Sequence, residues 1–258
     1  MCEIYALCAR RPVVANAHLR LFFADSVSNP HGWGLFWRKG RECLLHKEPL
    51  RAVDSSYLAS LLEEPIRSCG LVAHIRNATC GVLSYENCHP FLLEDRCGAT
   101  WAIAHNGTIL DEGLTKGYAA RAAGDTDSER AALFLVDQVN EAIRHKGSAL
   151  LWEERFEVLA KAVTDLSRNN KLNLIIDDGE CTYVHTNTKE STLYVRADDD
   201  ASFFCTRPLE EGDGWVSVPK MRLICYRDGH MLREGDAHGH AMDEAAYLRS
   251  LRERNLIG

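Results

Sequence analysis

Residues 126–166, TDSERAALFLVDQVNEAIRHKGSALLWEERFEVLAKAVTDL, predict two consecutive helices in the middle of the chain. The segment Thr126-Asp-Ser-Glu129 fits a capping box, with the threonine as N-cap and the glutamate three residues later. Apolar residues then recur at helical spacing from Leu133 to Ile143. Trp152–Leu166 has the pattern of a second amphipathic helix. The two helices separate an early part of the chain from a late part.

Short apolar segments on both sides of these helices predict β-strands. Strands, two helices and strands again favour an antiparallel α+β domain whose helices lie outside the sheets, and not a parallel βαβ succession. No repeat or linker divides the chain, so we predict one domain over residues 1–258. We expect strands at Glu3–Cys8, Gly34–Trp37, Glu42–His46, Leu71–Ile75, Trp101–Ala104, Leu172–Ile176, Cys181–His185, Thr192–Val195 and Arg222–Tyr226, and further helices at Asp54–Glu63 and Ala241–Arg254.

Charge and hydropathy exclude several classes of partner. The formal net charge is −7, which gives no electrostatic reason to expect nucleic acid or an anionic membrane. No apolar run approaches the roughly 20 residues that a bilayer span needs. Glu3, Arg10 and Arg11 interrupt what would be the apolar part of a signal peptide. The sequence therefore predicts a cytoplasmic protein.

The ten cysteines are spread over most of the chain, and no C-x-x-C pair occurs among them. In a reducing compartment, most of them are expected to be small buried apolar side chains. His74, Cys80, Cys88 and His89 lack the spacing of a zinc site, and the last two are adjacent. We therefore expect no metal and no cofactor.

Cys2 occupies an unusual place, because removal of Met1 would make it the first residue. It would then carry a thiol with a reference pKa of about 8.5 and an α-amine with one of about 7.7–8.0. A neutral amine can take the thiol proton, which gives a nucleophile and a base in one residue. The plain alternative is a buried strand residue.

Arg76 ends a buried strand and runs into a loop that contains Thr79 and Gly81. Its guanidinium group could hold a carboxylate through two parallel hydrogen bonds. An arginine paired with a structural acid is an equally good interpretation of this segment alone.

Two further segments offer polar groups at the ends of elements. Asn106 and Gly107 follow an apolar strand and supply a side-chain NH₂ and a main-chain N–H, the donor types of an oxyanion hole. An Asn-Gly turn is the alternative, and it is common between strands. Asp127 falls in the first turn of the predicted helix, where the dipole favours its ionised form and where it could accept from an ammonium group. A simple helix-start acid is the alternative there.

Taken together, these segments resemble the glutaminase domain of the class II glutamine amidotransferases, which are N-terminal-nucleophile (Ntn) hydrolases. They occur in the family's order, at similar separations, over about the first half of the chain. The resemblance rests on Met1-Cys2, Asn29-Pro-His-Gly-Trp-Gly34, His74–Thr79 with Gly81, Asn87–Phe91, His105-Asn-Gly107 and Thr126–Glu129. The segment Asn29–Gly34 resembles the corresponding segment of the small stand-alone members of the family, including those that hydrolyse γ-glutamyl amides.

The resemblance implies a four-layer αββα sandwich of two antiparallel sheets. It also implies that the nucleophile attacks a γ-amide carbonyl and forms a thioester, and that water then releases glutamate. The implied roles are Cys2 as nucleophile, Asn106 and Gly107 as oxyanion donors, Arg76 and Asp127 as ligands of the α-carboxylate and α-ammonium, and Thr79 in the pocket wall.

The sequence departs from the family pattern at two positions. Asn77 stands where several branches have tryptophan, and Cys80 stands where they have histidine, so the identity of the γ-glutamyl substrate stays open. A free-standing hydrolase is the preferred interpretation. A glutaminase subunit that passes ammonia to a separate synthase partner is the second, and a catalytically silent glutamyl-binding protein is the third. A homo-oligomer is compatible with each of them.

Overall fold

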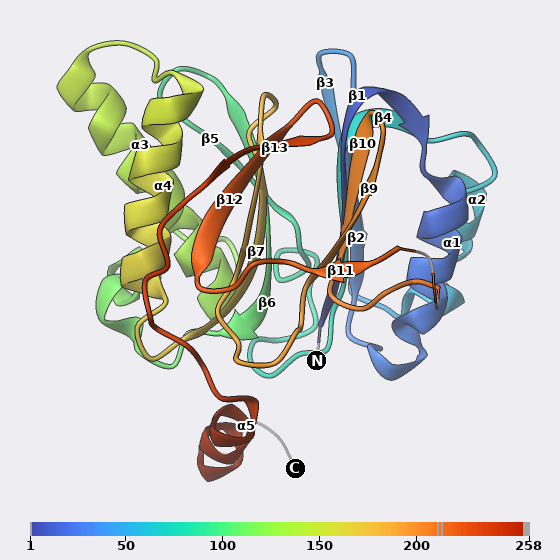
Figure 1. The fold of residues 1–258 in the computed structure, drawn as a ribbon. Helices are drawn as coiled ribbons and strands as arrows, with labels where there is room; N and C mark the ends of the chain where they lie inside the picture. The colour runs from blue at the N-terminus through green and yellow to red at the C-terminus, as the bar shows by residue number, and fades with distance from the viewer. Residues whose placement is uncertain (1, 211, 213, 255–258) are drawn as a thin grey trace.

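Two antiparallel sheets lie face to face at the centre of the protein (Figure 1). The computed structural model describes residues 2–210, 212 and 214–254. In spatial order, the first sheet consists of β11 (Val216–Ser217), β9 (Tyr194–Asp198), β10 (Ala201–Cys205), β1 (Glu3–Val14), β4 (Arg67–Ile75), β2 (Trp33–Lys39) and β3 (Glu42–Glu48). The second consists of β13 (His230–Glu234), β12 (Arg222–Arg227), β8 (Thr182–Thr186), β7 (Lys171–Asp177), β6 (Thr100–Thr108) and β5 (Phe91–Glu94).

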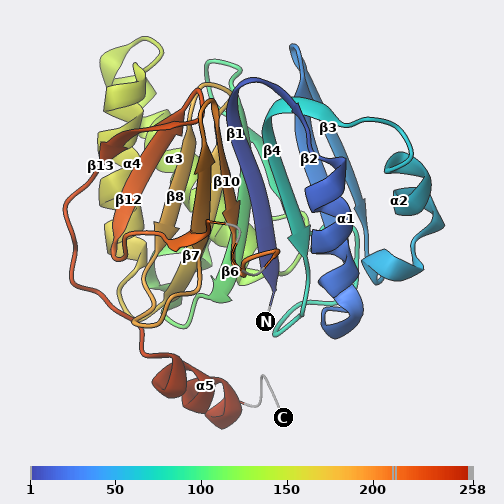
Figure 2. The same ribbon diagram turned by 45° about the vertical axis from the view of Figure 1, so that its right-hand side comes forward.

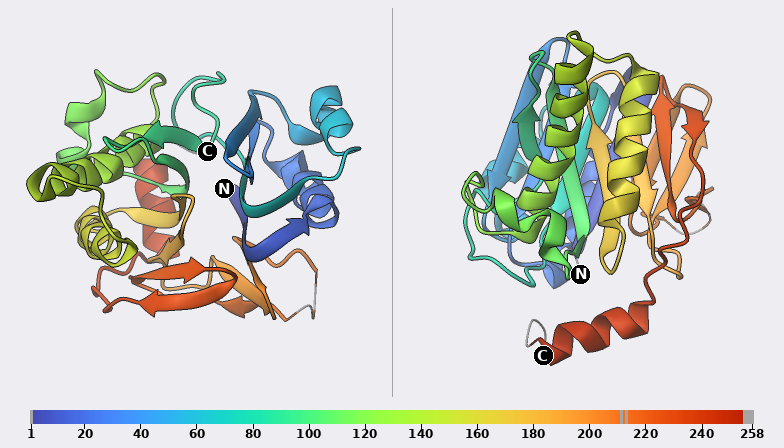
Figure 3. Two further views of the ribbon diagram at one scale, coloured as in Figure 1. Left: turned by 90° about the horizontal axis from the view of Figure 1, so that it is seen from above. Right: turned by 90° about the vertical axis from the view of Figure 1, so that its left-hand side faces the viewer.

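Helices cover the outer face of each sheet, which gives four layers (Figure 3, left). The first sheet is covered by α1 (Asn16–Ala24) and α2 (Ser56–Leu61), and the second by α3 (Asp127–Lys146) and α4 (Trp152–Leu166). The predicted αββα sandwich of two antiparallel sheets is therefore confirmed. None of the described helices combines the length and apolar character that a bilayer crossing requires.

Strand β1 shows why the two sheets stay together. Ile4 and Ala6 point into the core between the sheets, while Tyr5 and Leu7 point into the core beneath α1. Both faces of the strand are buried from Ile4 to Ala9, which explains the continuous apolar sequence of that part. Its neighbours are β10 and β4, so the strand that begins at Glu3 lies in the interior of its sheet.

The long helices agree closely with the sequence. The bounds of α4 are those predicted, and Thr126 caps α3 because its hydroxyl accepts a hydrogen bond from the Glu129 N–H at 3.2 Å. The other half of the predicted capping box does not form. The carboxylate of Glu129 instead accepts from the N–H groups of Ala123 and Gly124, at 2.8 Å each, and so fixes the loop before the helix.

Strand β6 continues beyond the predicted end at Ala104, through Asn106 and Gly107 to Thr108. Asn106 pairs with Asn173 of β7, and Thr108 pairs with Lys171. The Asn-Gly turn is therefore wrong for this segment. Gly107 is required here for another reason, since a Cβ at this position would lie 1.9 Å from the carbonyl oxygen of Lys171.

Helix α5 (Glu244–Glu253) lies outside the four layers, beneath the end of the sandwich at which β1 begins (Figures 1 and 2). It starts at the N-cap Asp243, whose side chain accepts from the N–H of Ala246 at 2.9 Å. Tyr247 and Leu251 are its buried side chains, and they lie four positions apart on one helix face.

Candidate active site

Four strand ends and one helix start converge at one end of the sandwich. β1 begins beside the end of β4, since Glu3 pairs with Ile75, and β6 ends beside the start of β7. This register brings together the residues that the sequence singles out from segments far apart in the chain. Cys2, Arg76, Thr79, Gly107 and Asp127 line one small pocket, and Asn106 borders it through a hydrogen bond to Cys2.

The thiol of Cys2 lies against the backbone of Asn77. Sγ accepts a hydrogen bond from the Asn77 N–H at 3.2 Å and lies 3.4 Å from the Asn77 carbonyl oxygen. Burial raises the pKa of the Cys2 thiol, and the Asn77 N–H opposes this effect. A thiol of this kind needs a base before it can attack a carbonyl carbon. Met1, and with it the predicted removal of that residue, lies outside the described residues.

Arg76 is a buried cation held by backbone carbonyls. Its side chain is 3% exposed, and its guanidinium donates to the carbonyls of Cys80 at 2.8 Å and Val82 at 3.0 Å. Within the described part of the chain, no carboxylate lies at ion-pair distance from it. A buried charge without a counter-ion is unfavourable, so an anion that replaced these carbonyls would bind strongly.

Asp127 is the matching anion at the start of α3. Its Oδ2 accepts from the Ile109 N–H at 2.6 Å, and its Oδ1 accepts from the Ser128 N–H at 2.9 Å. It is 5% exposed, and no described lysine or arginine pairs with it. Arg76 and Asp127 thus present opposite and individually unpaired charges to one pocket.

Cys80 connects these two charges. Its carbonyl accepts from Arg76, and its thiol donates to Asp127 Oδ1 at 3.2 Å. Burial and the Asp127 carboxylate raise the pKa of this thiol to about 12, so it stays a neutral donor. The departure from the family pattern at this position therefore places a thiol where it contacts an expected substrate ligand.

Asn106 uses its side-chain amide within the protein. Nδ2 donates to the Cys2 carbonyl oxygen at 2.5 Å, which leaves its second N–H for another acceptor. The adjacent Gly107 lines the pocket. The donor types predicted for an oxyanion hole therefore lie next to the predicted nucleophile.

Buried histidines form the floor of the site. His105 Nε2 lies 3.0 Å from the Lys171 carbonyl, so it carries the proton, and Nδ1 accepts from Ser128 at 2.9 Å. His89 stacks on His74 with ring centroids 4.1 Å apart. Burial and the nearby Arg76 lower the pKa of His74 to about 3. Over the described ranges, no three His, Cys, Asp or Glu side chains are arranged to hold a metal ion.

The loop from Asn77 to Val82 is fixed by contacts that its sequence alone did not reveal. Asn87 is fully buried, and its amide donates to the Val82 carbonyl at 2.9 Å and to Asp125 Oδ1 at 2.5 Å. Gly81 has φ +77°, and a Cβ there would lie 2.6 Å from Asp125 Oδ1. The motif at 87–91 drew attention to Asn87, but its partners come from two other segments.

The pocket is small in this structure. Its free volume is about 20 Å³, which is enough for about one water molecule. A glutamyl group would have to displace the contacts that the loop makes with Arg76 and Asp127. A larger cleft of about 470 Å³ lies at the opposite end of the sandwich, but Arg38 and Asp177 pair with each other across it, N to O at 2.6 Å. The size of a cleft therefore does not identify the site here.

Comparison with known proteins supports the resemblance. The family model described as glutamine amidotransferases class-II matches residues 1–198. The Escherichia coli (strain K12) protein YafJ, whose name assigns it only provisionally to the glutamine amidotransferases, is 29% identical over 87% of this chain and 98% of its own. The gamma-glutamyl-hercynylcysteine sulfoxide hydrolase of Mycobacterium tuberculosis is 22% identical over 77% of this chain and 76% of its own.

Solved structures show the same fold. A Pseudomonas aeruginosa PA01 protein described as a predicted glutamine amidotransferase aligns with a TM-score of 0.62, at 20% identity, over 90% of this chain and 100% of that one. The glutamine phosphoribosylpyrophosphate amidotransferase of B. subtilis aligns with a TM-score of 0.67, at 16% identity, over 92% of this chain. This chain spans 49% of the latter.

Proposed function

Because the chain belongs to the class II glutamine amidotransferases, we propose that it hydrolyses the γ-amide of glutamine or of a γ-glutamyl compound, with Cys2 as its nucleophile. The observation that carries this proposal is the pair of buried, unpaired and opposite charges, Arg76 and Asp127, beside the Cys2 thiol. A glutamyl α-carboxylate complements the first, and its α-ammonium complements the second. The named γ-glutamyl hydrolase among the relatives supports the same class of substrate.

In the proposed reaction, the α-amine of Cys2 accepts the thiol proton, directly or through a water molecule. The thiolate attacks the γ-carbonyl carbon, and the oxygen of that carbonyl becomes negative. The second N–H of Asn106 and the backbone N–H of Gly107 stabilise that oxygen. The C–N bond breaks, the amine leaves with the proton, and a thioester to Cys2 remains. Water then cleaves the thioester and releases glutamate.

In this proposal, the loop from Asn77 to Val82 has a second part, because the pocket is too small for a glutamyl group as it stands. The substrate carboxylate would replace the carbonyls of Cys80 and Val82 on Arg76, and the substrate ammonium would replace the Cys80 thiol on Asp127. Each exchange substitutes a charged partner for a neutral one, which favours binding. Thr79 lies in the same loop and would form part of the pocket wall.

Steady-state kinetics of the purified protein with a panel of γ-glutamyl amides, glutamine included, tests the proposal. We expect glutamate release that requires the α-carboxylate and α-ammonium of the substrate. Intact mass of the active protein should show that Met1 is absent. Full activity from protein that retains Met1 would contradict the single-residue mechanism, and binding without turnover across the panel would favour a silent glutamyl-binding protein. Glutamine hydrolysis that rises when a synthase is added would favour the ammonia-donating subunit.

A further inference from the structure

Helix α5 makes buried polar contacts with the end of β6, which carries Asn106 and Gly107, and with the start of β7. The family model covers residues 1–198, so α5 lies beyond the matched part of the chain. The helix nevertheless lies beneath the same end of the sandwich as the candidate active site (Figure 3, right). Its side chains Glu244 and Tyr247 face the start of β7 and the end of β6.

Lys171, the first residue of β7, is fully buried and points to α5. Its Nζ lies 2.9 Å from the carboxylate of Glu244 and 4.6 Å from the centre of the Tyr247 ring. Burial lowers the pKa of Lys171, and the Glu244 carboxylate opposes this shift. Removing one partner of a buried ion pair leaves the other charge uncompensated and strongly destabilises the fold. This contact therefore holds α5 against β7.

Tyr247 fixes the neighbouring strand. Its hydroxyl lies 2.8 Å from Thr108 Oγ1, and both side chains are buried. Thr108 directly follows Gly107, and it pairs with Lys171 across the two strands. Thr108, Lys171 and Tyr247 therefore form a closed set of contacts around the end of β6.

The backbone of Lys171 completes this arrangement. Its carbonyl oxygen contacts the His105 ring and leaves no room for a side chain at Gly107. A shift of Lys171 or Thr108 would consequently move Asn106 and Gly107 relative to Cys2. A misplacement of about 1 Å in a catalytic group can lower a rate on the order of 10²-fold.

We propose that α5 positions the oxyanion donors, with Tyr247 and Lys171 as positioning residues that act through Thr108 and the backbone of β7. The inference rests on the proposed function, since Asn106 and Gly107 need that placement only if they stabilise an oxyanion. Neither side chain lines the pocket. Their effect should therefore appear in kcat and leave KM nearly unchanged.

The test compares Tyr247→Phe with Tyr183→Phe. Tyr183 is also buried, and its hydroxyl donates to Asp178 at 2.9 Å. This contact lies at the opposite end of the sandwich from α5. Each substitution therefore removes one buried hydroxyl hydrogen bond. We expect Tyr247→Phe to lower kcat about tenfold, with KM within about twofold of wild type. Tyr183→Phe should keep the wild-type kcat per folded molecule. Equal kcat values for the two variants, at matched melting temperatures, would overturn the proposal.

A double variant shows whether Tyr247 acts through the oxyanion donors. In an Asn106→Ala background, Tyr247→Phe should lower kcat clearly less than it does in the wild-type background, because only the Gly107 N–H then remains to be positioned and coupled residues are not additive. Effects that multiply in full would contradict positioning of Asn106 by Tyr247.

Hydrogen exchange separates this inference from the proposed function. Peptides that contain residues 105–110 should exchange faster in Tyr247→Phe than in Tyr183→Phe, whether or not the protein turns over a γ-glutamyl amide. Faster exchange without any turnover would retain the structural link and reject the proposed function. Unchanged exchange together with normal turnover would reject the inference alone.

Discussion

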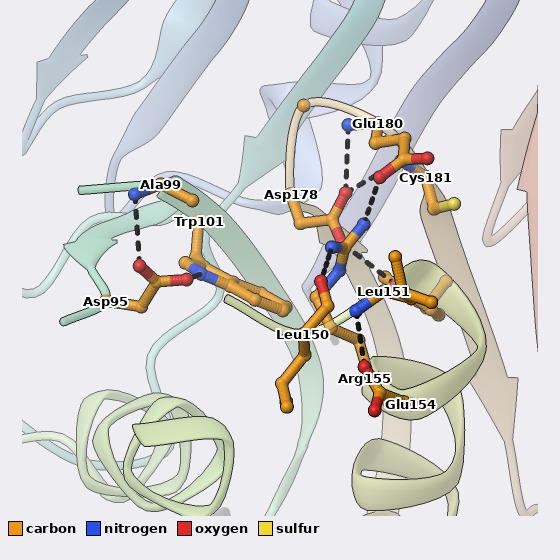
Figure 4. A network of polar contacts seen from close by, with 12 residues as sticks. Asp95, Ala99, Trp101, Leu150, Leu151, Glu154, Arg155, Asp178, Glu180 and Cys181 are labelled. Carbon is orange, nitrogen blue, oxygen red and sulfur yellow. Dashed lines mark hydrogen bonds and ion pairs between the residues drawn. The ribbon is translucent and has the colours of Figure 1, made fainter. Parts of the chain in front are cut away.

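The two ends of the sandwich contain arginines in contrasting surroundings, Arg76 buried at the site end and Arg155 half-buried at the far end. At the far end, Arg155 of α4 donates to Asp178 at 2.7 Å and to Glu180 at 2.5 Å, and also to the Leu150 carbonyl (Figure 4). At the site end, Arg76 donates only to carbonyls among the described residues. One cation is neutralised by the protein itself, and the other is not.

The buried carboxylates differ in whether all of their partners are fixed parts of the fold. Asp95 accepts from Trp101 Nε1 at 3.0 Å and from the Ala99 N–H at 3.1 Å, which ties the start of β6 to its own turn (Figure 4). Asp178 likewise accepts from Arg155 and from the N–H of Cys181. Asp127, in contrast, has a neutral thiol on one oxygen. A buried carboxylate whose partners are a cation or N–H donors fixed by the fold maintains the structure, whereas one that also holds a displaceable neutral thiol indicates a ligand.

Replacing the nucleophile should have the largest effect on turnover. Cys2→Ala and Cys2→Ser should abolish γ-glutamyl hydrolysis, because the alanine has no nucleophile and the serine hydroxyl is far harder to deprotonate by an α-amine. Glutamate release measures this. The control is Cys97→Ala, an exposed cysteine on the turn before β6, which should turn over normally. Residual activity of Cys2→Ala near the wild-type value would reject the assignment.

Changing the unpaired charges should come next. Arg76→Lys and Asp127→Asn should each lower kcat/KM, by an amount that corresponds to on the order of 2–5 kcal/mol of transition-state stabilisation. An ammonium cannot replace a bidentate guanidinium, and a neutral amide cannot form an ion pair with a cation. The matched control is Arg155→Lys at the far end, where kcat/KM should not change. Wild-type kinetics of Arg76→Lys with a substrate that has a free α-carboxylate would refute the role of Arg76.

Asn106→Ala should lower kcat by about 10²–10³ with little change in substrate binding, because this donor acts mainly in the transition state. If Asn106 is only a strand residue, the variant will lose stability and keep its turnover per folded molecule. Melting temperature and kcat measured on one preparation distinguish the two outcomes.

Breaking the contacts of Arg155 with Asp178 and Glu180 at the far end of the sandwich should lower stability and leave catalysis unchanged. Arg155→Met leaves Asp178 buried and without its cation, which should lower the free energy of unfolding by about 3–5 kcal/mol. Arg144→Met removes an exposed pair with Glu141, so its free energy of unfolding should stay close to the wild-type value. Chemical denaturation of both variants measures this. A loss of kcat per folded molecule in Arg155→Met would show that the two ends are coupled.

Acid should weaken the site end through its neutral histidines. The pKa of His74 is about 3 in the fold against an ordinary value of 6.5, so the unfolded chain binds this proton first as pH falls. The contribution of His74 to stability is therefore present above about pH 6.5 and is lost progressively toward pH 3. His74→Phe should lose roughly 2 kcal/mol less stability than wild type between pH 7 and 4.5. Equal losses would contradict a buried neutral imidazole.

The sequence predicted the elements and groups that short local patterns encode. The bounds of α4 and the N-cap at Thr126 follow from helical periodicity and capping, and the site residues lie in short motifs. Neither α1 nor β10 was predicted, because β10 is defined by its pairing with β1, about two hundred positions earlier. The single domain and the roles of the site residues stay predictions.

The contacts of α5 could not have been predicted from local patterns. Tyr247 and Thr108 are 139 positions apart, and neither lies in a recognisable motif. The alternative interpretation of Asn106-Gly107 as a turn was wrong for a related reason. Pairing with β7 extends the strand, and the glycine is needed for the close carbonyl of Lys171. Local propensity is weak information where a neighbouring strand decides the backbone.

The interior position of β1 limits how the protein can be handled in the laboratory. An affinity tag ahead of Cys2 would acylate the amine that the proposed mechanism needs, and α5, the last described helix, lies beneath the same end of the sandwich. The turn between β2 and β3 is a better site for an inserted peptide, because Gly40 has open space around it and lies at the opposite end. A reporter placed there would leave both the first residue and the last helix free.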